Sequence, residues 1–225
     1  VPPGPSSRLS LSAVTLSAVA DVHGFPLLRH TVFFSGDYAA EFDQIASGRP
    51  PLSPTVYVCA QDRDVHGTTK TAGPERFFCI VNAPPVTGKP PEPSEPQVEF
   101  TSCIAAMDQT LRQCGLKASF RPDATLITTP PDFAQLFPAT GGALYGMASH
   151  GWMASFRRSG SRARLPGLYF AGASVHPGPG LPMAALSGRQ AAASLISDLA
   201  SMRTSSRVAM RGGTSMPSAT TRTTD

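Results

Sequence analysis

The chain has 225 residues, of which 41% are hydrophobic and only 15% are charged, against roughly 25% charged residues in an average soluble domain. Its net charge is +4, but Lys and Arg are scattered and form no basic stripe interleaved with aromatic residues, which argues against nucleic-acid binding. The charge suits a weak attraction to anionic lipid heads instead. Because no apolar run reaches about 18 residues and no secretion signal opens the chain, the sequence predicts no membrane span.

The first sixty residues predict three strands and a short helix. Alternating residues at 9–20, and β-branched and aromatic runs at 30–34 and 55–59, are typical of strands. A helix between the second and third strands is indicated by apolar residues on one face and a terminating glycine: Tyr38, Phe42, Ile45 and Gly48.

The middle of the chain predicts a strand, a loop, a helix and a further strand. Residues 77–81 form an apolar strand pattern that stops at two prolines, and residues 84–96 contain six prolines, as expected of a surface loop. Residues 126–129 predict the last strand. The helix is indicated by an apolar stripe that we interpret as core packing, ended by a glycine: Phe100, Ile104, Met107, Leu111, Cys114 and Gly115.

The four cysteines predict neither a disulfide framework nor a metal site. They are Cys59, Cys79, Cys103 and Cys114. No two of them form a C-x-x-C pair, and no histidine pair accompanies them at ligand spacing. We therefore expect reduced, structural thiols, which suit a cytosolic protein.

Residues 140–199 carry the pattern that suggests ligand binding. Residues 167–173 predict a short buried strand ending in small residues, 174–182 a Gly/Pro-rich loop, and 183–199 a helix with a face of small residues. Gly172 and Ala173 would let backbone come close to a ligand, and the helix N-terminus would favour an anionic or electron-rich group. The same pattern also fits an ordinary strand–loop–helix unit without a ligand. Gly178 and Gly180 lack the third glycine of a dinucleotide phosphate loop.

The segment 167–189, GLYFAGASVHPGPGLPMAALSGR, resembles the C-terminal flavin signature of bacterial-type phytoene desaturases and their carotenoid oxidoreductase relatives. Within that family the similarity is greatest to the hydroxyneurosporene desaturase branch, also called methoxyneurosporene dehydrogenase or 1-hydroxycarotenoid 3,4-desaturase. Four further stretches share this resemblance, at residues 32–38, 54–63, 141–146 and 148–152. The end of the signature, at 187–192, is also similar to flavin amine oxidases.

The resemblance implies an α/β fold: the C-terminal part of an FAD-binding, Rossmann-like (amine-oxidase-like) flavoprotein with a mixed-sheet substrate lobe. It predicts a substrate lobe at residues 1–139, a flavin-binding segment at 140–200 and a disordered tail at 201–225. The family's glycine-rich dinucleotide loop is absent from this sequence, which opens at Val1. We therefore expect a C-terminal fragment whose partner is the N-terminal half of the same enzyme.

The resemblance also implies FAD as cofactor and desaturation of an acyclic hydroxy- or methoxy-carotenoid, by hydride transfer to the flavin and loss of a neighbouring proton. We expect the enzyme to be cytoplasmic and peripheral to the inner membrane, without a metal. The residues implied in FAD binding are Gly172, Ala173, Ser174, Gly180, Leu181, Pro182 and Met183.

An oily polyene should contact apolar and aromatic side chains, and the candidates, each of which could equally be core, are Phe33, Phe34, Leu144, Tyr145 and Trp152. The candidate acid–base residues are His150 and His176, although a backbone hydrogen bond is an alternative use of the latter. Two alternative functions stay open. One is a phytoene desaturase or another flavin amine-oxidase-like oxidoreductase, and the other is an inactive fragment that binds hydrophobic molecules.

Overall fold

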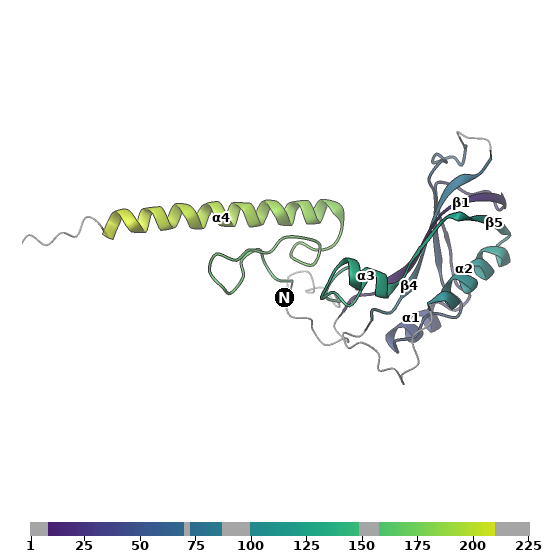
Figure 1. The fold of residues 1–225 in the computed structure, drawn as a ribbon, viewed down its shortest axis with the longest axis horizontal. Coiled ribbons are helices and arrows are strands. Elements are labelled where there is room, and N and C mark those ends of the chain that lie inside the picture. Colours follow the sequence, from purple (N-terminus) through teal and green to yellow (C-terminus); the bar gives the residue numbers. More distant parts are fainter. Residues whose placement is uncertain (1–8, 70–72, 87–99, 149–157, 210–225) are drawn as a thin grey trace, which may run out of the picture. The chain divides into compact units, whose positions relative to one another are not determined.

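The computed structural model of the chain describes residues 9–69, 73–86, 100–148 and 158–209. The chain divides into two compact units, Val1–Trp152 and Met153–Asp225. The described part of the first unit contains a five-stranded sheet and helices α1 to α3, and that of the second contains the long helix α4 (Figure 1).

The sheet of the first unit has the strand order β2-β3-β4-β1-β5. All its strand pairs among the described residues are antiparallel, so the mixed sheet that we expected is not observed, and the Rossmann-like part stays a prediction. The strands are β1 (Ser12–Gly24), β2 (His30–Phe33), β3 (Val56–Ala60), β4 (Glu75–Ala83) and β5 (Leu116–Thr128).

The core lies between one face of this sheet and helix α2 (Thr101–Gln113), which runs along it (Figure 1). Leu16 of β1 is paired with Cys79 of β4 on one side and with Ile127 of β5 on the other. The stripe on α2 is confirmed as core packing at Phe100, Met107 and Leu111, which are buried in one cluster, and at Ile104, which packs against it. Cys114, the last residue of the predicted stripe, is exposed. Full burial of a side chain such as Leu or Met stabilises the folded state by about 1.5–3 kcal/mol relative to leaving it exposed.

Helix α1 (Tyr38–Ala46) begins at a side-chain cap and is held by a buried carboxylate. The Asp37 side chain accepts a hydrogen bond of 3.0 Å from the Ala40 N–H, which satisfies one of the free donors of the first turn. Glu41 is buried, and its carboxylate accepts bonds from the Thr55 N–H at 3.0 Å and from Asn82 Nδ2 at 3.2 Å. Glu41 therefore ties α1 to the ends of β3 and β4.

The predicted strands at 9–20, 30–34, 55–59 and 77–81 are confirmed by β1 to β4. The last strand is longer than predicted, since β5 starts at Leu116 and its first half, in which buried apolar and exposed polar residues alternate, is paired with β1. Helix α3 (Pro130–Leu136) was not predicted, although its capping box between Thr129 and Asp132 is a readable start signal. Most of the predicted loop 84–96 lies outside the described residues.

Two expectations for the second unit differ from the structure. Residues 167–173 do not form a strand, because within the described part of the chain this segment makes one isolated bridge, Arg162 with Tyr169. An apolar run becomes a strand only where a neighbouring strand pairs with it. Helix α4 (Leu181–Ala209) continues past residue 200, where we expected disorder to begin. The assignment of substrate and flavin roles to segments 1–139 and 140–200 stays a prediction.

Candidate functional site

The sheet has a second face, opposite α2, that carries apolar side chains outside the core. Since side chains alternate along a strand, paired residues form rows across the sheet. One row runs through all five strands and consists of Val32, Tyr57, Ile80, Thr15 and Thr128. With strands spaced about 4.8 Å apart, this row is ~19 Å long.

A parallel row lies beside the first, displaced by two residues on every strand. It consists of His30, Cys59, Phe78, Ser17 and Leu126. We call these two rows together the open face. Val32 and Leu126 are exposed, and Tyr57, Phe78 and Ile80 are half-buried. The open face is thus a surface of mainly apolar groups that a long apolar molecule could cover.

The open face also has a polar pair. The Nδ1 atom of His30 lies 2.8 Å from the hydroxyl oxygen of Tyr57, and the two rings are stacked with centroids 6.1 Å apart. Burial raises the pKa of Tyr57, as does the neighbouring Cys59, whereas the charge of Arg29 opposes the rise. The phenol therefore stays protonated at neutral pH and can donate a hydrogen bond.

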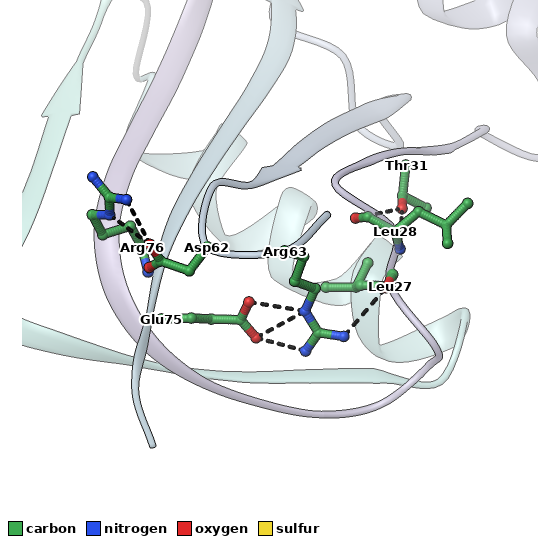
Figure 2. Close-up of polar contacts among 7 residues, drawn as sticks. All are labelled: Leu27, Leu28, Thr31, Asp62, Arg63, Glu75 and Arg76. Carbon is green, nitrogen blue, oxygen red and sulfur yellow. Dashed lines mark hydrogen bonds and ion pairs between the residues drawn. The ribbon is translucent and has the colours of Figure 1, made fainter. Parts of the chain in front are cut away.

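An ion pair holds the chain segment that leads into His30 (Figure 2). The Arg63 guanidinium bonds both carboxylate oxygens of Glu75, with Nη2 to Oε1 at 2.6 Å and Nε to Oε2 at 2.9 Å. Its Nη1 donates to the Leu27 carbonyl at 3.2 Å. The side chains of Arg63 and Glu75 are only 14% and 6% exposed. We did not predict this pair, although residue 63 closes the family-like stretch 54–63.

The substrate candidates that the structure describes lie on two segments, the end of β2 and the loop after α3. Phe33 lies on the core face, 4% exposed, with its ring edge-on to Phe25 at 5.0 Å. This burial fits the alternative of core packing, and a role of Phe33 in lining the substrate site stays a prediction. Phe34 is 68% exposed and begins an aromatic series with Tyr38 and Phe42, at centroid distances of 6.1 and 4.9 Å.

The remaining substrate candidates lie in or near the loop after α3. The Leu144 N–H donates to the Leu11 carbonyl at 3.1 Å, and the Tyr145 N–H donates to Ser10 Oγ at 2.9 Å. This loop is thereby attached to the start of β1, with the Tyr145 side chain exposed. Trp152 and His150 lie outside the described residues.

In the second unit, residues 172–180, which we call the glycine loop, lead into the first turn of α4. The backbone of this loop is uncovered at two glycines. Gly172 and Gly180 have φ angles of +127° and +109°, and no described atom lies within 4 Å of a Cβ built on either. The Gly180 carbonyl accepts from the Ala184 N–H at 2.9 Å and so begins the helix. Of the other residues predicted to bind FAD, Ala173 is half-buried and the rest are exposed: Ser174, Leu181, Pro182 and Met183.

The glycine loop is anchored to α4 by Ser187. This side chain is fully buried, and its Oγ accepts a hydrogen bond of 3.0 Å from the Gly172 N–H. The Val175 N–H closes a turn onto the Gly172 carbonyl, and the His176 N–H donates to the Ser159 carbonyl at 2.9 Å. The His176 backbone thus has a structural partner, and a catalytic role for its side chain stays a prediction.

Residues 161–170 are joined to α4 by a hydroxyl pair, Ser161 Oγ with Ser194 Oγ at 2.9 Å, and by a cluster around Asp198. The Arg162 guanidinium bonds Asp198, with Nη2 to Oδ1 at 2.9 Å and Nε to Oδ2 at 3.1 Å, and the Tyr169 hydroxyl donates to Asp198 Oδ2 at 2.7 Å. The Arg162 guanidinium, followed by the Tyr169 hydroxyl, lowers the pKa of Asp198. The bond to Asp198 raises the pKa of Tyr169.

The uncovered glycine loop is compatible with FAD, because close approach of a ligand to backbone requires positions without a side chain. The first turn of α4, with its exposed side chains, adds a helix N-terminus suited to an electron-rich group. Among the described residues, no group of three or more His, Cys, Asp or Glu side chains could hold a metal ion. None of the described helices is both long and apolar enough to cross a membrane.

Comparison with known proteins bears directly on the resemblance noted in the sequence. No protein-family model matches the chain. The hydroxyneurosporene desaturase of Rubrivivax gelatinosus is 52% identical over 216 residues, which are 96% of this chain and 40% of that protein. The hydroxyneurosporene desaturase of Cereibacter sphaeroides is 46% identical over 192 residues, 85% of this chain and 37% of that protein.

A 1-hydroxycarotenoid 3,4-desaturase of a Flavobacterium species is 29% identical over 168 residues, 73% of this chain and 33% of that protein. The matches confirm the resemblance: the chain belongs to the carotenoid desaturase family. Within that family it is similar to the hydroxyneurosporene desaturases, of which it spans about two fifths of the length.

Proposed function

We propose that this chain is part of an FAD-dependent oxidoreductase that desaturates an acyclic hydroxy- or methoxy-carotenoid in carotenoid biosynthesis. The observation that carries the proposal is the 52% identity over 216 residues with a hydroxyneurosporene desaturase. This match covers 96% of the chain, and therefore includes residues of both the open face and the glycine loop.

We propose that the open face binds the polyene. A carotenoid chain offers no charge and few polar atoms, so its binding free energy comes from apolar contact. The open face supplies Phe78 and Ile80 on β4 and Leu126 on β5, with β1 between these two strands, and an extended molecule could lie along its two rows. Of the residues predicted from the sequence, Phe34, Leu144, Tyr145 and Trp152 stay candidates for further contacts.

FAD is the cofactor in this proposal. When bound, it would accept a hydride from one carbon, while the neighbouring carbon loses a proton. Gly172 and Gly180 would leave room for it, and Leu181 and Met183 in the first turn of α4 would lie against it. The buried Ser187 would keep the loop in the conformation that exposes this backbone.

We also propose that the enzyme works in the cytoplasm, at the surface of the inner membrane, where a lipophilic carotenoid is dissolved. Phe34 and Tyr38, the exposed members of the aromatic series, support this, because exposed aromatic side chains partition favourably into the bilayer interface. Leu52, which is also exposed, would add to such a surface.

The proposed activity can be tested on the intact gene product that contains this chain, reconstituted with vesicles, FAD and an acyclic hydroxycarotenoid. Each added double bond lengthens the conjugated system, so we expect a product with absorption at longer wavelength, formed only when FAD is present. Saturable FAD binding without conversion of any hydroxylated acyclic carotenoid would overturn the proposal. Conversion of phytoene in its place would support the alternative phytoene desaturase.

The proposed binding face has a matched pair of variants. Leu126 on the open face is 66% exposed, and Leu136 on α3 is 65% exposed. Leu126→Arg should weaken carotenoid binding at least tenfold, because it places a charge under the polyene, whereas Leu136→Arg should leave binding unchanged. Equal effects of the two variants would show that the polyene binds elsewhere.

A further inference from the structure

Among the mainly apolar side chains of the open face, His30 and Tyr57 bring a nitrogen and a hydroxyl oxygen to within 2.8 Å of each other. The two residues come from adjacent strands and from neighbouring rows. Val32 and Ile80 flank Tyr57 on either side in its own row. A long apolar ligand on this face would therefore meet a hydrogen-bonding pair at one defined place.

The backbone beside this pair is held at several points. The Arg29 N–H donates to the Asp64 carbonyl at 3.2 Å, and the Arg29 carbonyl accepts from the Ala60 N–H at 3.0 Å. The buried ion pair of Arg63 with Glu75 adds the bond to the Leu27 carbonyl (Figure 2). His30 thus follows a segment whose position is fixed by the β3–β4 connection, and such a supporting shell is typical of a side chain that must be placed accurately.

The pair has hydrogen-bonding capacity left over. Nδ1 of His30 is used by Tyr57, and within the described part of the chain the second ring nitrogen, Nε2, has no hydrogen-bond partner. A phenol oxygen has one proton and two lone pairs, so it can bond His30 and one further group. Together the two residues can serve a ligand hydroxyl, which needs both a donor and an acceptor.

We infer that His30 and Tyr57 bind the terminal oxygen of a hydroxylated acyclic carotenoid and so set its register along the open face. The inference rests on the proposed function and adds the group that selects the substrate. With apolar rows alone, a polyene could bind at several positions along the open face, because the methyl and methine groups make similar contacts at each position. One hydrogen-bonded end removes this freedom.

The register matters because the site of reaction lies near the oxygen. In a 1-hydroxycarotenoid that is desaturated at its 3,4-bond, as in the name of the Flavobacterium relative, the hydroxylated carbon C1 is only two bonds from C3. Anchoring the hydroxyl therefore also anchors the bond to be oxidised. Tyr57 and His30 act here as specificity-determining residues, and no proton transfer is assigned to them.

The test compares two ligands in the intact gene product: an acyclic hydroxycarotenoid and the same carotenoid without its hydroxyl. Binding in detergent micelles is followed by quenching of intrinsic protein fluorescence. The protein with its own sequence should bind the hydroxylated ligand roughly two- to tenfold more tightly, which is the range expected for one uncharged hydrogen bond. Tyr57→Phe keeps the ring and removes the hydroxyl, so it should abolish the preference without changing the affinity for the unsubstituted ligand. His30→Phe should do the same.

The possible results separate this inference from the proposed function. A preference that survives both substitutions overturns the inference, as does an equal loss of affinity for both ligands, which indicates a purely structural pair. If the unsubstituted protein binds and desaturates both carotenoids equally well, the inference fails and the proposed function stands. If it binds neither carotenoid, both fail.

Discussion

Ser187 and Gly172, fifteen residues apart, are joined by a hydrogen bond of 3.0 Å from the Gly172 N–H to the buried Ser187 Oγ. This bond attaches the glycine loop to α4 one and a half turns after the helix begins. Its acceptor comes from a side chain that sequence analysis interpreted only as small.

Ser187→Ala should release the glycine loop. The substitution removes the acceptor of the half-buried Gly172 N–H, and the net contribution of such a hydrogen bond to the free energy of folding is about 0.5–1.5 kcal/mol. We expect a lower thermal unfolding midpoint and at least tenfold weaker FAD binding in a fluorescence titration. Ser201→Ala is the control, because Ser201 is exposed on the same helix and bonds only the Ser197 carbonyl. Equal effects at both positions would contradict the anchoring role.

Glu75→Gln should destabilise the first unit strongly. It leaves the Arg63 charge in a largely buried place without its anionic partner, and removing one partner of a buried pair costs about 3–5 kcal/mol, an upper range for a pair that keeps some solvent contact. Urea unfolding measures the loss. Asp123→Asn breaks the exposed pair with Arg121 and should change the free energy of unfolding by less than about 1 kcal/mol. An equally small loss of unfolding free energy for Glu75→Gln would contradict the stabilising role of the Arg63–Glu75 ion pair.

The four thiols should react with an aromatic disulfide reagent at pH 8 in a fixed order. Burial raises the pKa of Cys103 to about 11 and that of Cys79 well above its ordinary value, so neither should react before unfolding. Cys114 is exposed at the end of α2 and should react first, followed by the half-buried Cys59 on the open face. Cys114→Ser should remove the fast phase.

The same reagent reports on the open face. If a carotenoid covers Cys59, the ligand should slow the second phase and leave the first phase, from Cys114, unchanged. A ligand that slows neither phase, although it is bound, does not lie on the open face.

The contact of Asp198 with Arg162 and Tyr169 predicts a pH dependence at acid pH. Because the pKa of Asp198 is lowered on folding from its ordinary value of 3.8, its contribution to stability is present above pH 3.8. It is lost as the pH falls below 3.8 through the folded-state pKa. A carbon NMR titration of the carboxyl group should give a midpoint below 3.8. Arg162→Gln should raise that midpoint more than Tyr169→Phe, since the guanidinium contributes most; the reverse order would contradict this account.

Much of the first unit was predictable from local pattern. The strands β1 to β4 and the helices α1 and α2 follow from periodicity and from breakers such as Gly48 and Gly115. Both glycines have positive φ angles, +77° and +84°, as helix-ending glycines commonly do. The first half of β5 was missed, although Leu116, Ala118 and Phe120 alternate with polar residues as in a half-buried strand.

The candidate site was predictable only in part. The glycine loop could be found because its residue types are unusual and match a family signature. The open face could not be predicted, because strand register places residues such as Val32 and Thr128 in one row. The register between strands distant in sequence cannot be derived from either strand alone. Phe33 and Phe34 show the same difficulty: adjacent aromatic residues, of which one is core and the other is exposed.

The place of β1 within the sheet has a consequence for how the chain is made. Although β1 precedes the other strands of this sheet along the chain, it pairs with β4 and β5, and Thr15 meets Thr128 only after roughly 110 further residues are synthesised. At about 5–20 residues per second this takes roughly 5–20 s. Until β4 is made, β1 has both edges unpaired, and its edge toward β5 stays unpaired for the whole of that time, so the nascent chain should depend on a holding chaperone.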